Sequence, residues 1–374
     1  MLSESSYSWG EIRKGLDWPM LIAILALFAL GLISIYSAGA GVRRSTAGYA
    51  VRQLVWGALS LLAYVAVLRI GYQNFLKQSY LIYALAFFML CVLFMLGTTT
   101  RGALSWFRFG SVGFQPAEFG KAALVLFLSR FCHRYPPDVP KHMAGALALS
   151  GIMVIMILLQ PDLGSALVYG SIIFAMITAA GAPGKYLGGL AAAGIAAMPF
   201  FWSSLKAYQK LRLVVFLDPY IDPQGAGYNV IQSRIAVGSG GLWGKGFLHG
   251  TQGRLHFLPE PHTDFIFSVF AEEFGFVGGV IVIVLFAFLF WRLLRAAFRT
   301  KDARGKLLCV GVSAWIWFQV MESVAMSMGL APITGLPLPL FSYGGSSLLM
   351  EFFGLALVQS VAISPARDKF ASIT

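Results

Sequence analysis

One stretch of the sequence gathers ionisable side chains at high density. Residues 258–278 read LPEPHTDFIFSVFAEEFGFVG and contain Glu260, His262, Asp264, Glu272 and Glu273. The whole chain of 374 residues has only 16 Asp and Glu. In a chain this apolar, ionisable groups at a membrane edge are costly to keep unless they are used. A carboxylate in such a place can act as a general base or as a cation ligand.

Two shorter pieces place charges within or beside apolar segments. QPAEFGKAA contains Glu118 and Lys121, which share one face of a helix because they are three residues apart. An acid and a base inside a membrane helix should form an ion pair or face a wet cavity, and both interpretations stay open. QPDLG contains Asp162, which can cap the following helix or line a cavity.

Two loops carry cations that could meet an anionic group. The glycine-rich run 238–246 includes Lys245 and could wrap an anion such as a pyrophosphate, although it does not fit the P-loop pattern. The piece TTTRGALSWFRFG combines aromatic residues with Arg101 and Arg108, which is typical of a membrane-surface segment. An ordinary interfacial anchor and a lipid head-group contact both explain it.

The elements that must position these residues are membrane helices. The chain is 58% hydrophobic and 12% charged, whereas soluble domains carry roughly 25% charged residues. The net charge of +12 is expected from cations that flank membrane helices, so we expect no nucleic-acid partner. A spanning helix needs about 20 mostly apolar residues. Ten such segments are predicted: 18–38, 51–70, 79–98, 116–133, 143–160, 164–181, 186–203, 268–298, 305–330 and 342–363.

The predicted fold class is therefore an all-α integral membrane protein, with one polytopic domain over residues 1–374. Lys and Arg are concentrated in one set of the short loops, which predicts that both termini are cytoplasmic. Residues 1–17 form a cytoplasmic tail, and residues 204–267 form one long extracytoplasmic loop between helices seven and eight. The prolines of PITGLPLPLFSYGGSS forbid a regular helix before the tenth segment, so this piece could line a cavity.

These pieces together resemble the SEDS family (shape, elongation, division and sporulation proteins). QPAEFGKAA, QPDLG, AVGSGGLWGKG, the stretch 258–278 and PITGLPLPLFSYGGSS occur in the order typical of that family. The pieces around Gly250 and before Ser342 and Tyr343 look more like the elongation branch (RodA) than the division branch (FtsW). One departure is Ser105, where the family usually has Arg.

The resemblance implies a peptidoglycan glycosyltransferase in the bacterial cytoplasmic membrane. Its substrate would be lipid II, and its partners would be a class B penicillin-binding transpeptidase and the elongation machinery. Asp264 matches the essential aspartate of the family. The linkage changes from α in the donor to β in the polymer, so the reaction inverts and needs a base but no enzyme nucleophile.

We therefore assign Asp264 as the base that takes the proton of the acceptor hydroxyl. Mg²⁺ or Mn²⁺ could assist, in which case Asp264 could be a metal ligand, and we expect no organic cofactor. Taken alone, Asp264 could also be a helix N-cap. The expected substrate-binding residues, which include the cations for the pyrophosphate, are Arg52, Arg101, Arg108, Glu118, Lys121, Asp162, Lys245, Glu260, His262, Ser342 and Tyr343.

Three other functions remain open from the sequence. Ten helices with intramembrane charges also suit a flippase for lipid II, although no inverted repeat is visible. A scaffold for the transpeptidase would not require Asp264. The division role of the FtsW branch is the third.

Overall fold

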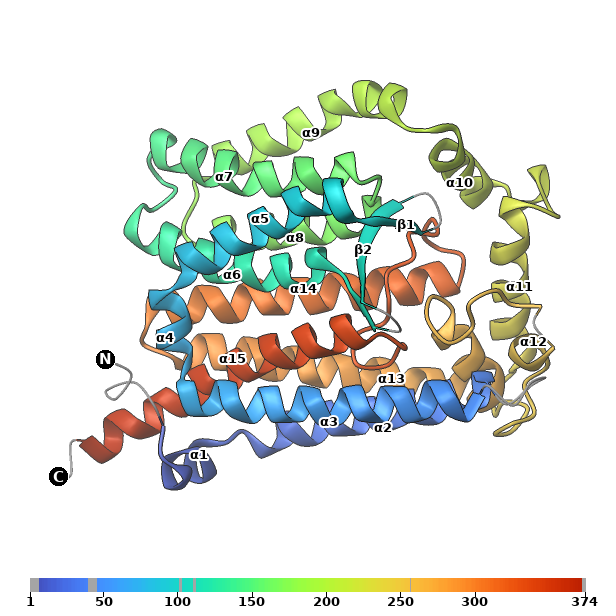
Figure 1. Ribbon diagram of the computed structural model, residues 1–374, viewed down its shortest axis with the longest axis horizontal. Coiled ribbons are helices and arrows are strands. Elements are labelled where there is room, and N and C mark those ends of the chain that lie inside the picture. Colours follow the sequence, from blue (N-terminus) through green and yellow to red (C-terminus); the bar gives the residue numbers. More distant parts are fainter. Residues whose placement is uncertain (1–6, 40–45, 101–102, 110–111, 256, 372–374) are drawn as a thin grey trace.

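The computed structural model describes residues 7–39, 46–100, 103–109, 112–255 and 257–371. Its helices run side by side as a bundle (Figure 1). Each of the ten predicted apolar segments coincides with a helix. These helices are α2 (Trp18–Gly39), α3 (Thr46–Ile70), α5 (Ser79–Leu96), α6 (Pro116–Arg134), α7 (Pro140–Leu159), α8 (Leu163–Ala179), α9 (Gly184–Ser204), α13 (Ile266–Arg299), α14 (Ala303–Ser327) and α15 (Gly345–Ala371).

Length and composition identify this chain as an integral membrane protein. Within the described residues, seven of the helices (α2, α3, α5, α7, α13, α14 and α15) are long and apolar enough to cross a membrane. Of the other three, α6 contains Glu118 and Lys121, and α8 is only 17 residues long. At the centre, α14 packs against α6, α8, α13 and α15, so polar side chains on these helices lie deep inside the protein.

The bundle has two distinct ends (Figure 1). The short helices α1 (Trp9–Gly15) and α4 (Tyr72–Lys77) lie at one end, together with the last turns of α15. Neither short helix was predicted. Ser8 and Glu11 form a capping box at the start of α1, which explains why a polar tail is helical there.

The opposite end is covered by a segment that was predicted to be a loop. Residues 205–255 contain α10 (Ala207–Leu217), the 3₁₀ turn η1 (Pro219–Ile221), α11 (Ala226–Ser239) and α12 (Thr251–Arg254). Asp218 caps η1, and Asp222 fixes the turn that leads into α11. The Asp218 carboxylate accepts from the Tyr220 N–H, and the Asp222 carboxylate accepts from the N–H groups of Gly225 and Ala226.

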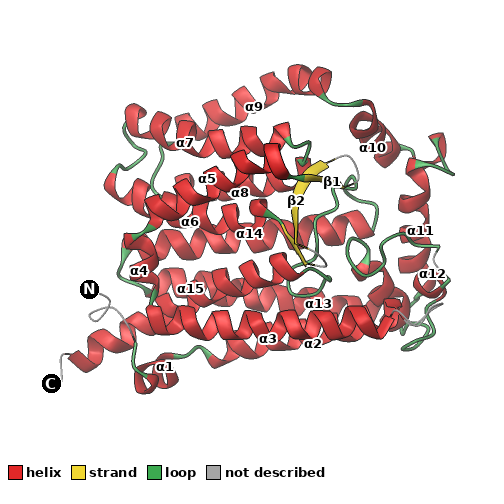
Figure 2. Cartoon of the chain, viewed as in Figure 1, coloured by secondary structure: helices red, strands yellow, loops and turns green. Residues whose placement is uncertain are grey.

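A small antiparallel sheet corrects the all-α prediction (Figure 2). Its strands are β1 (Thr98–Thr100), β2 (Ala103–Phe109) and β3 (Val112–Phe114), in the order β1-β2-β3. Arg108 pairs with Gly113 across β2 and β3. Because side chains alternate along a strand, Trp106 and Arg108 lie on the same face of β2. Trp106, Phe107 and Arg108, which were predicted to lie at the membrane surface, are thus held on a hairpin.

Helix α13 is broken near its beginning, and a glycine-rich loop fills the break. Gly275 has φ +66° and ψ −165°, so the N–H groups that follow it lose their helical acceptors. The Phe276 N–H donates to the Gly241 carbonyl oxygen at 2.9 Å, and the Val277 N–H donates to that of Leu242 at 3.1 Å. In return, the N–H groups of Lys245 and Gly246 donate to the carbonyl oxygens of Glu272 and Glu273, each at 3.0 Å. The N–H groups of Lys245 and Gly246 are therefore bonded to α13 and do not bind an anion.

Two glycines of this loop give a matched test of the docking. Gly241 and Gly244 both have positive φ, but a Cβ on Gly241 would enter open space, whereas one on Gly244 would collide with the Glu273 carbonyl oxygen. We expect Gly241→Ala to cost roughly 1–2 kcal/mol of folding free energy, the usual cost of a left-handed conformation in an L-residue. Gly244→Ala should cost clearly more, measured as a lower thermal midpoint in detergent. Equal midpoints for the two variants would contradict this account of the docking.

Candidate functional site

A cavity of about 760 Å³ opens at the end of the bundle that carries α10 to α12. Its walls include α3, β2, α10, the turn before α13, the irregular segment 332–344 and the first turn of α15. Six residues that the sequence predicts as site residues line it: Arg52, Arg108, Asp162, Glu260, Asp264 and Tyr343. The fold thus brings together side chains that are almost 300 residues apart in the sequence.

Asp264 lies in the turn that leads into α13 and lines the cavity. The N-cap position of α13 is Phe265 and not Asp264. The Asp264 carboxylate lies beside Gly335, because a Cβ on Gly335 would be 3.6 Å from Asp264 Oδ2. The carboxylate is therefore placed against the irregular segment, at the wall of the cavity.

The turn that carries Asp264 is bonded directly to that segment. The Ser342 hydroxyl donates to the Thr263 carbonyl oxygen at 2.7 Å, and the Tyr343 N–H donates to that of His262 at 2.9 Å. Gln53 of α3 fixes the same segment, since its Nε2 donates to the Ser342 carbonyl oxygen at 3.0 Å and its Oε1 accepts from the Gly344 N–H at 3.2 Å. The predicted tenth helix begins only at Gly345, so Ser342 and Tyr343 belong to this segment and not to a helix.

His262 lies in a cluster of rings next to the cavity and does not line it. Its ring stacks on Tyr49 with centroids 4.4 Å apart, and Tyr49 meets Tyr343 edge to face at 5.1 Å. His262 Nε2 lies 3.8 Å from Glu260 Oε2. The Ser342 hydroxyl is likewise outside the lining and bridges Thr263 and Leu338. His262 and Ser342, both predicted to bind substrate, thus connect the elements around the cavity and do not line it.

Three arginines from three different elements line the cavity. Arg52 comes from α3, Arg108 from β2, and Arg212 from α10. Guanidinium groups bind phosphate oxygens through paired N–H donors, so this arrangement suits a pyrophosphate. Arg101 lies outside the described residues. Arg212 was missed, because residues 204–267 were taken as a loop. The available signal was the amphipathic pattern of AYQKLRLVVFL, which is typical of a helix.

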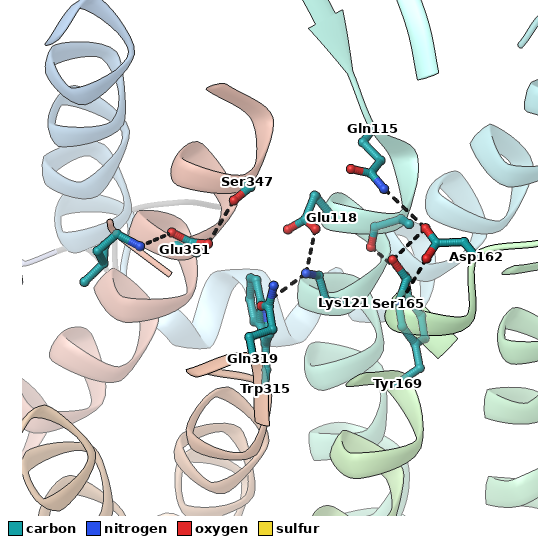
Figure 3. A network of polar contacts seen from close by, with 12 residues as sticks. Gln115, Glu118, Lys121, Asp162, Ser165, Tyr169, Trp315, Gln319, Ser347 and Glu351 are labelled. Carbon is teal, nitrogen blue, oxygen red and sulfur yellow. Dashed lines mark hydrogen bonds and ion pairs between the residues drawn. The ribbon is translucent and has the colours of Figure 1, made fainter. Parts of the chain in front are cut away.

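Asp162 combines the two roles that the sequence leaves open. It is the N-cap of α8, with Oδ1 accepting from the Ser165 N–H at 3.0 Å and Oδ2 from the Ser165 hydroxyl at 2.8 Å. Gln115 Nε2 also donates to Asp162 Oδ2, at 3.4 Å (Figure 3). Because Asp162 and Gln115 both line the cavity, the cap forms part of its wall.

Glu118 and Lys121 form a buried ion pair below the cavity and are not part of its lining. Lys121 Nζ lies 2.7 Å from Glu118 Oε1 and donates to Gln319 Oε1 at 3.3 Å (Figure 3). Lys121 Nζ also lies 5.0 Å from the centre of the Trp315 ring. Both charged side chains are almost fully buried, so the pair neutralises charge where α6 meets α14.

Lys245 lies away from the cavity lining, in contact with α13. Its Nζ lies 2.6 Å from Glu272 Oε1, and the same oxygen accepts from the N–H and hydroxyl of Thr251. The buried Glu273 accepts from the Ser37 hydroxyl of α2. The two carboxylates that follow Asp264 in the sequence therefore fasten the outer loops to the bundle.

The described residues contain no cluster of three or more His, Cys, Asp and Glu side chains that could hold a metal ion by itself. Besides Asp162, which caps α8, two carboxylates line the cavity: Asp264 and Glu260. Mg²⁺ is commonly held by one or two carboxylates together with phosphate oxygens, so this donor set fits a cation that a phosphorylated substrate would help to bind.

Comparison with known proteins places the chain among cell-wall enzymes. A family model described as cell cycle protein, for FtsW, RodA and SpoVE, matches residues 18–366. The peptidoglycan glycosyltransferase MrdB of Escherichia coli K12 is 36% identical over 356 residues, which cover 94% of this chain and 94% of MrdB.

Two solved structures are also similar. A chain from a peptidoglycan synthase complex that coordinates polymerization and crosslinking has a TM-score of 0.79 and 35% identity, and the match covers 95% of this chain and 98% of that one. The rod shape determining protein RodA of Thermus thermophilus has a TM-score of 0.70 and 30% identity, with the same coverage.

The ion pair below the cavity predicts an asymmetric response to mutation. Lys121→Met leaves the Glu118 carboxylate buried without its cation, so we expect a loss of about 3–5 kcal/mol of folding free energy. The double variant Glu118→Leu/Lys121→Met removes both charges and should recover most of that loss. Thermal unfolding of the purified proteins in detergent measures both effects. A double variant that is less stable than Lys121→Met would show that the pair is not the main stabilising contact there.

Proposed function

We propose that this chain, which belongs to the family of cell cycle proteins that comprises FtsW, RodA and SpoVE, is a peptidoglycan glycosyltransferase. It polymerises lipid II into glycan strands during cell elongation. The observation that carries the proposal is one cavity that holds the Asp264 carboxylate together with Arg52, Arg108 and Arg212. Transfer of a sugar from a pyrophosphate-linked donor needs a base for the acceptor hydroxyl and guanidinium groups for the leaving pyrophosphate.

In this mechanism, the three arginines bind the pyrophosphate of the donor lipid and neutralise the charge that grows on it as it leaves. Asp264 accepts the proton from the 4-hydroxyl of the acceptor sugar. The bond between that oxygen and the anomeric carbon of the donor forms while the bond from that carbon to the pyrophosphate breaks. Undecaprenyl pyrophosphate departs, and the configuration at the anomeric carbon inverts.

A divalent cation is proposed as an assistant to this step. Mg²⁺ or Mn²⁺ would be held by Asp264 and Glu260 together with pyrophosphate oxygens, and it would add positive charge beside the leaving group. In that case Asp264 would serve as a ligand in addition to, or in place of, its role as base.

We place the cavity on the outer face of the bacterial cytoplasmic membrane. All ten predicted segments, including the three that are short or charged, would then cross the membrane, with both termini in the cytoplasm. Two features support this topology: the enrichment of Lys and Arg in the loops of one side, and the position of the cavity at the end of the bundle opposite the last turns of α15.

The partner that we propose is a class B penicillin-binding transpeptidase of the elongation machinery. Support comes from the solved relative, which belongs to a complex that coordinates polymerization with crosslinking. Glycan strands made at the cavity would be handed to this partner for crosslinking. A mere scaffold for the same partner would not need a carboxylate in a cavity lined with arginines.

Polymerisation of purified lipid II tests the proposal. With the partner transpeptidase and Mg²⁺ present, the wild type should give ladders of glycan strands. Asp264→Asn keeps the shape of the side chain but removes the base, so the rate should fall by about 10²–10⁴-fold. The control is Asp222→Asn, the same change at a carboxylate outside the cavity lining, where Asn keeps one of the two oxygens that accept from the N–H groups of Gly225 and Ala226.

Two outcomes would reject the proposal. If Asp264→Asn makes ladders as fast as Asp222→Asn, then Asp264 is not the base. If the wild type makes no polymer but moves labelled lipid II across vesicle membranes, the chain is a transporter.

Arg212 provides a second test, since the sequence alone did not predict it. Arg212→Gln removes one guanidinium from the pyrophosphate site, and we expect kcat/KM for lipid II to fall about 10–100-fold, the usual effect of losing a hydrogen bond to a charged group. Lys210→Gln removes a charge from the same helix outside the cavity lining and should change kcat/KM little. Equal losses in both variants would mean that only the overall positive charge of α10 matters.

A further inference from the structure

Glu351 is a buried carboxylate that the proposed mechanism does not use. It lies on α15 and is 1% exposed. Its Oε2 accepts from the Leu340 N–H at 2.7 Å, and its Oε1 accepts from the Ser347 hydroxyl at 2.9 Å (Figure 3). The carboxylate therefore joins α15 to the irregular segment that precedes it, at the point where Ser347 lines the cavity.

The N–H of Leu340, a buried residue with an unusual backbone conformation, finds its acceptor in the Glu351 carboxylate. Leu340 has φ +63° and is 1% exposed. A non-glycine residue with positive φ stores strain, which persists only when the surroundings hold it in place. The N–H groups of Phe341 and Ser342 donate to the Leu338 carbonyl oxygen, whereas that of Leu340 donates to Glu351. A buried N–H without an acceptor is costly, so the Glu351 carboxylate stabilises this turn directly.

The turn at Leu340 is connected to Asp264 through a short series of contacts. Two residues after Leu340, the Ser342 hydroxyl donates to Thr263, and the next N–H, that of Tyr343, donates to His262. His262 and Thr263 immediately precede Asp264. A shift at Leu340 would therefore be passed to the carboxylate through two hydrogen bonds of 2.7 and 2.9 Å.

We propose that Glu351 is a positioning residue for the transfer reaction. It holds the turn at Leu340 in its strained conformation, and through Ser342 and Tyr343 it sets the place of Asp264 at the cavity wall. The proposal rests on the assignment of Asp264 as the base. Glu351 touches no substrate, and its hydrogen bonds, not its charge, carry the effect.

Three variants test this role in the complex with the partner transpeptidase. Glu351→Leu removes both acceptors. Glu351→Gln keeps a carbonyl oxygen for the Leu340 N–H in a side chain of the same shape. Gln359→Leu is the matched control, since Gln359 is also a fully buried polar residue of α15, and neither of its side-chain polar atoms has a partner among the described residues.

We expect Glu351→Leu to lower kcat for lipid II polymerisation about 10–100-fold while KM stays within about threefold, because a base displaced by about 1 Å loses rate and not substrate affinity. Glu351→Gln and Gln359→Leu should stay within about threefold of wild type. The proposal is overturned if Glu351→Leu keeps its kcat, if Glu351→Gln loses as much as Glu351→Leu, or if Gln359→Leu does.

Hydrogen exchange gives a readout that does not depend on polymerisation. Glu351→Leu should speed amide exchange about tenfold or more in 336–344 and in 258–265, because opening of the turn becomes easier. Gln359→Leu should leave both segments as in wild type. Unchanged exchange in Glu351→Leu would overturn the positioning role. A wild type that makes no polymer would instead reject the proposed function and leave the exchange result to decide the role of Glu351.

Discussion

The structure depends on one constraint: inside a membrane, each backbone polar group must find its partner within the protein. Regular helices meet this constraint by themselves, but a binding site at the membrane edge needs irregular backbone. Here the irregular pieces are bonded to one another and to side chains of the regular helices α3 and α15. The glycine loop 238–246 bonds the break in α13, Gln53 and Ser342 bond the segment before α15, and Glu351 bonds the strained turn at Leu340. The irregular wall of the cavity is possible because other irregular segments and polar side chains of α3 and α15 supply the missing hydrogen-bond partners.

The same physics separates the carboxylates by role. Glu272 and Glu273 are buried and accept from N–H or hydroxyl groups of other elements, so they are structural. Asp264 lies only a few residues earlier in the sequence but lines the cavity. Asp162 does both, since it caps α8 and forms part of the wall. A high density of carboxylates in one stretch therefore indicates structural contacts between loops and helices as well as a binding site.

The sequence predicts the helical bundle well because apolar segments of about 20 residues have few alternatives in a membrane. It predicts Asp264 and Arg108 at the site because both lie in recognisable polar pieces. It does not predict α10 or Arg212, since a short amphipathic helix looks like a loop in a chain this apolar. The contact of Lys245 with Glu272 is equally hidden, because it depends on how the glycine loop docks on α13. Local sequence patterns do not determine which loops and helices pair when they are far apart in the sequence.

The break at Gly275 has a consequence for how the site relates to the membrane. A continuous helix would transmit any rotation or change of tilt along its axis to the residues before it. At Gly275 the helical phase is reset, so the first turns of α13 take their orientation from the glycine loop and from Ser37, and not from the long lipid-facing part that follows. The start of α13, which follows directly on Asp264, is thereby held from the side by the glycine loop and by α2 as well as along its own axis.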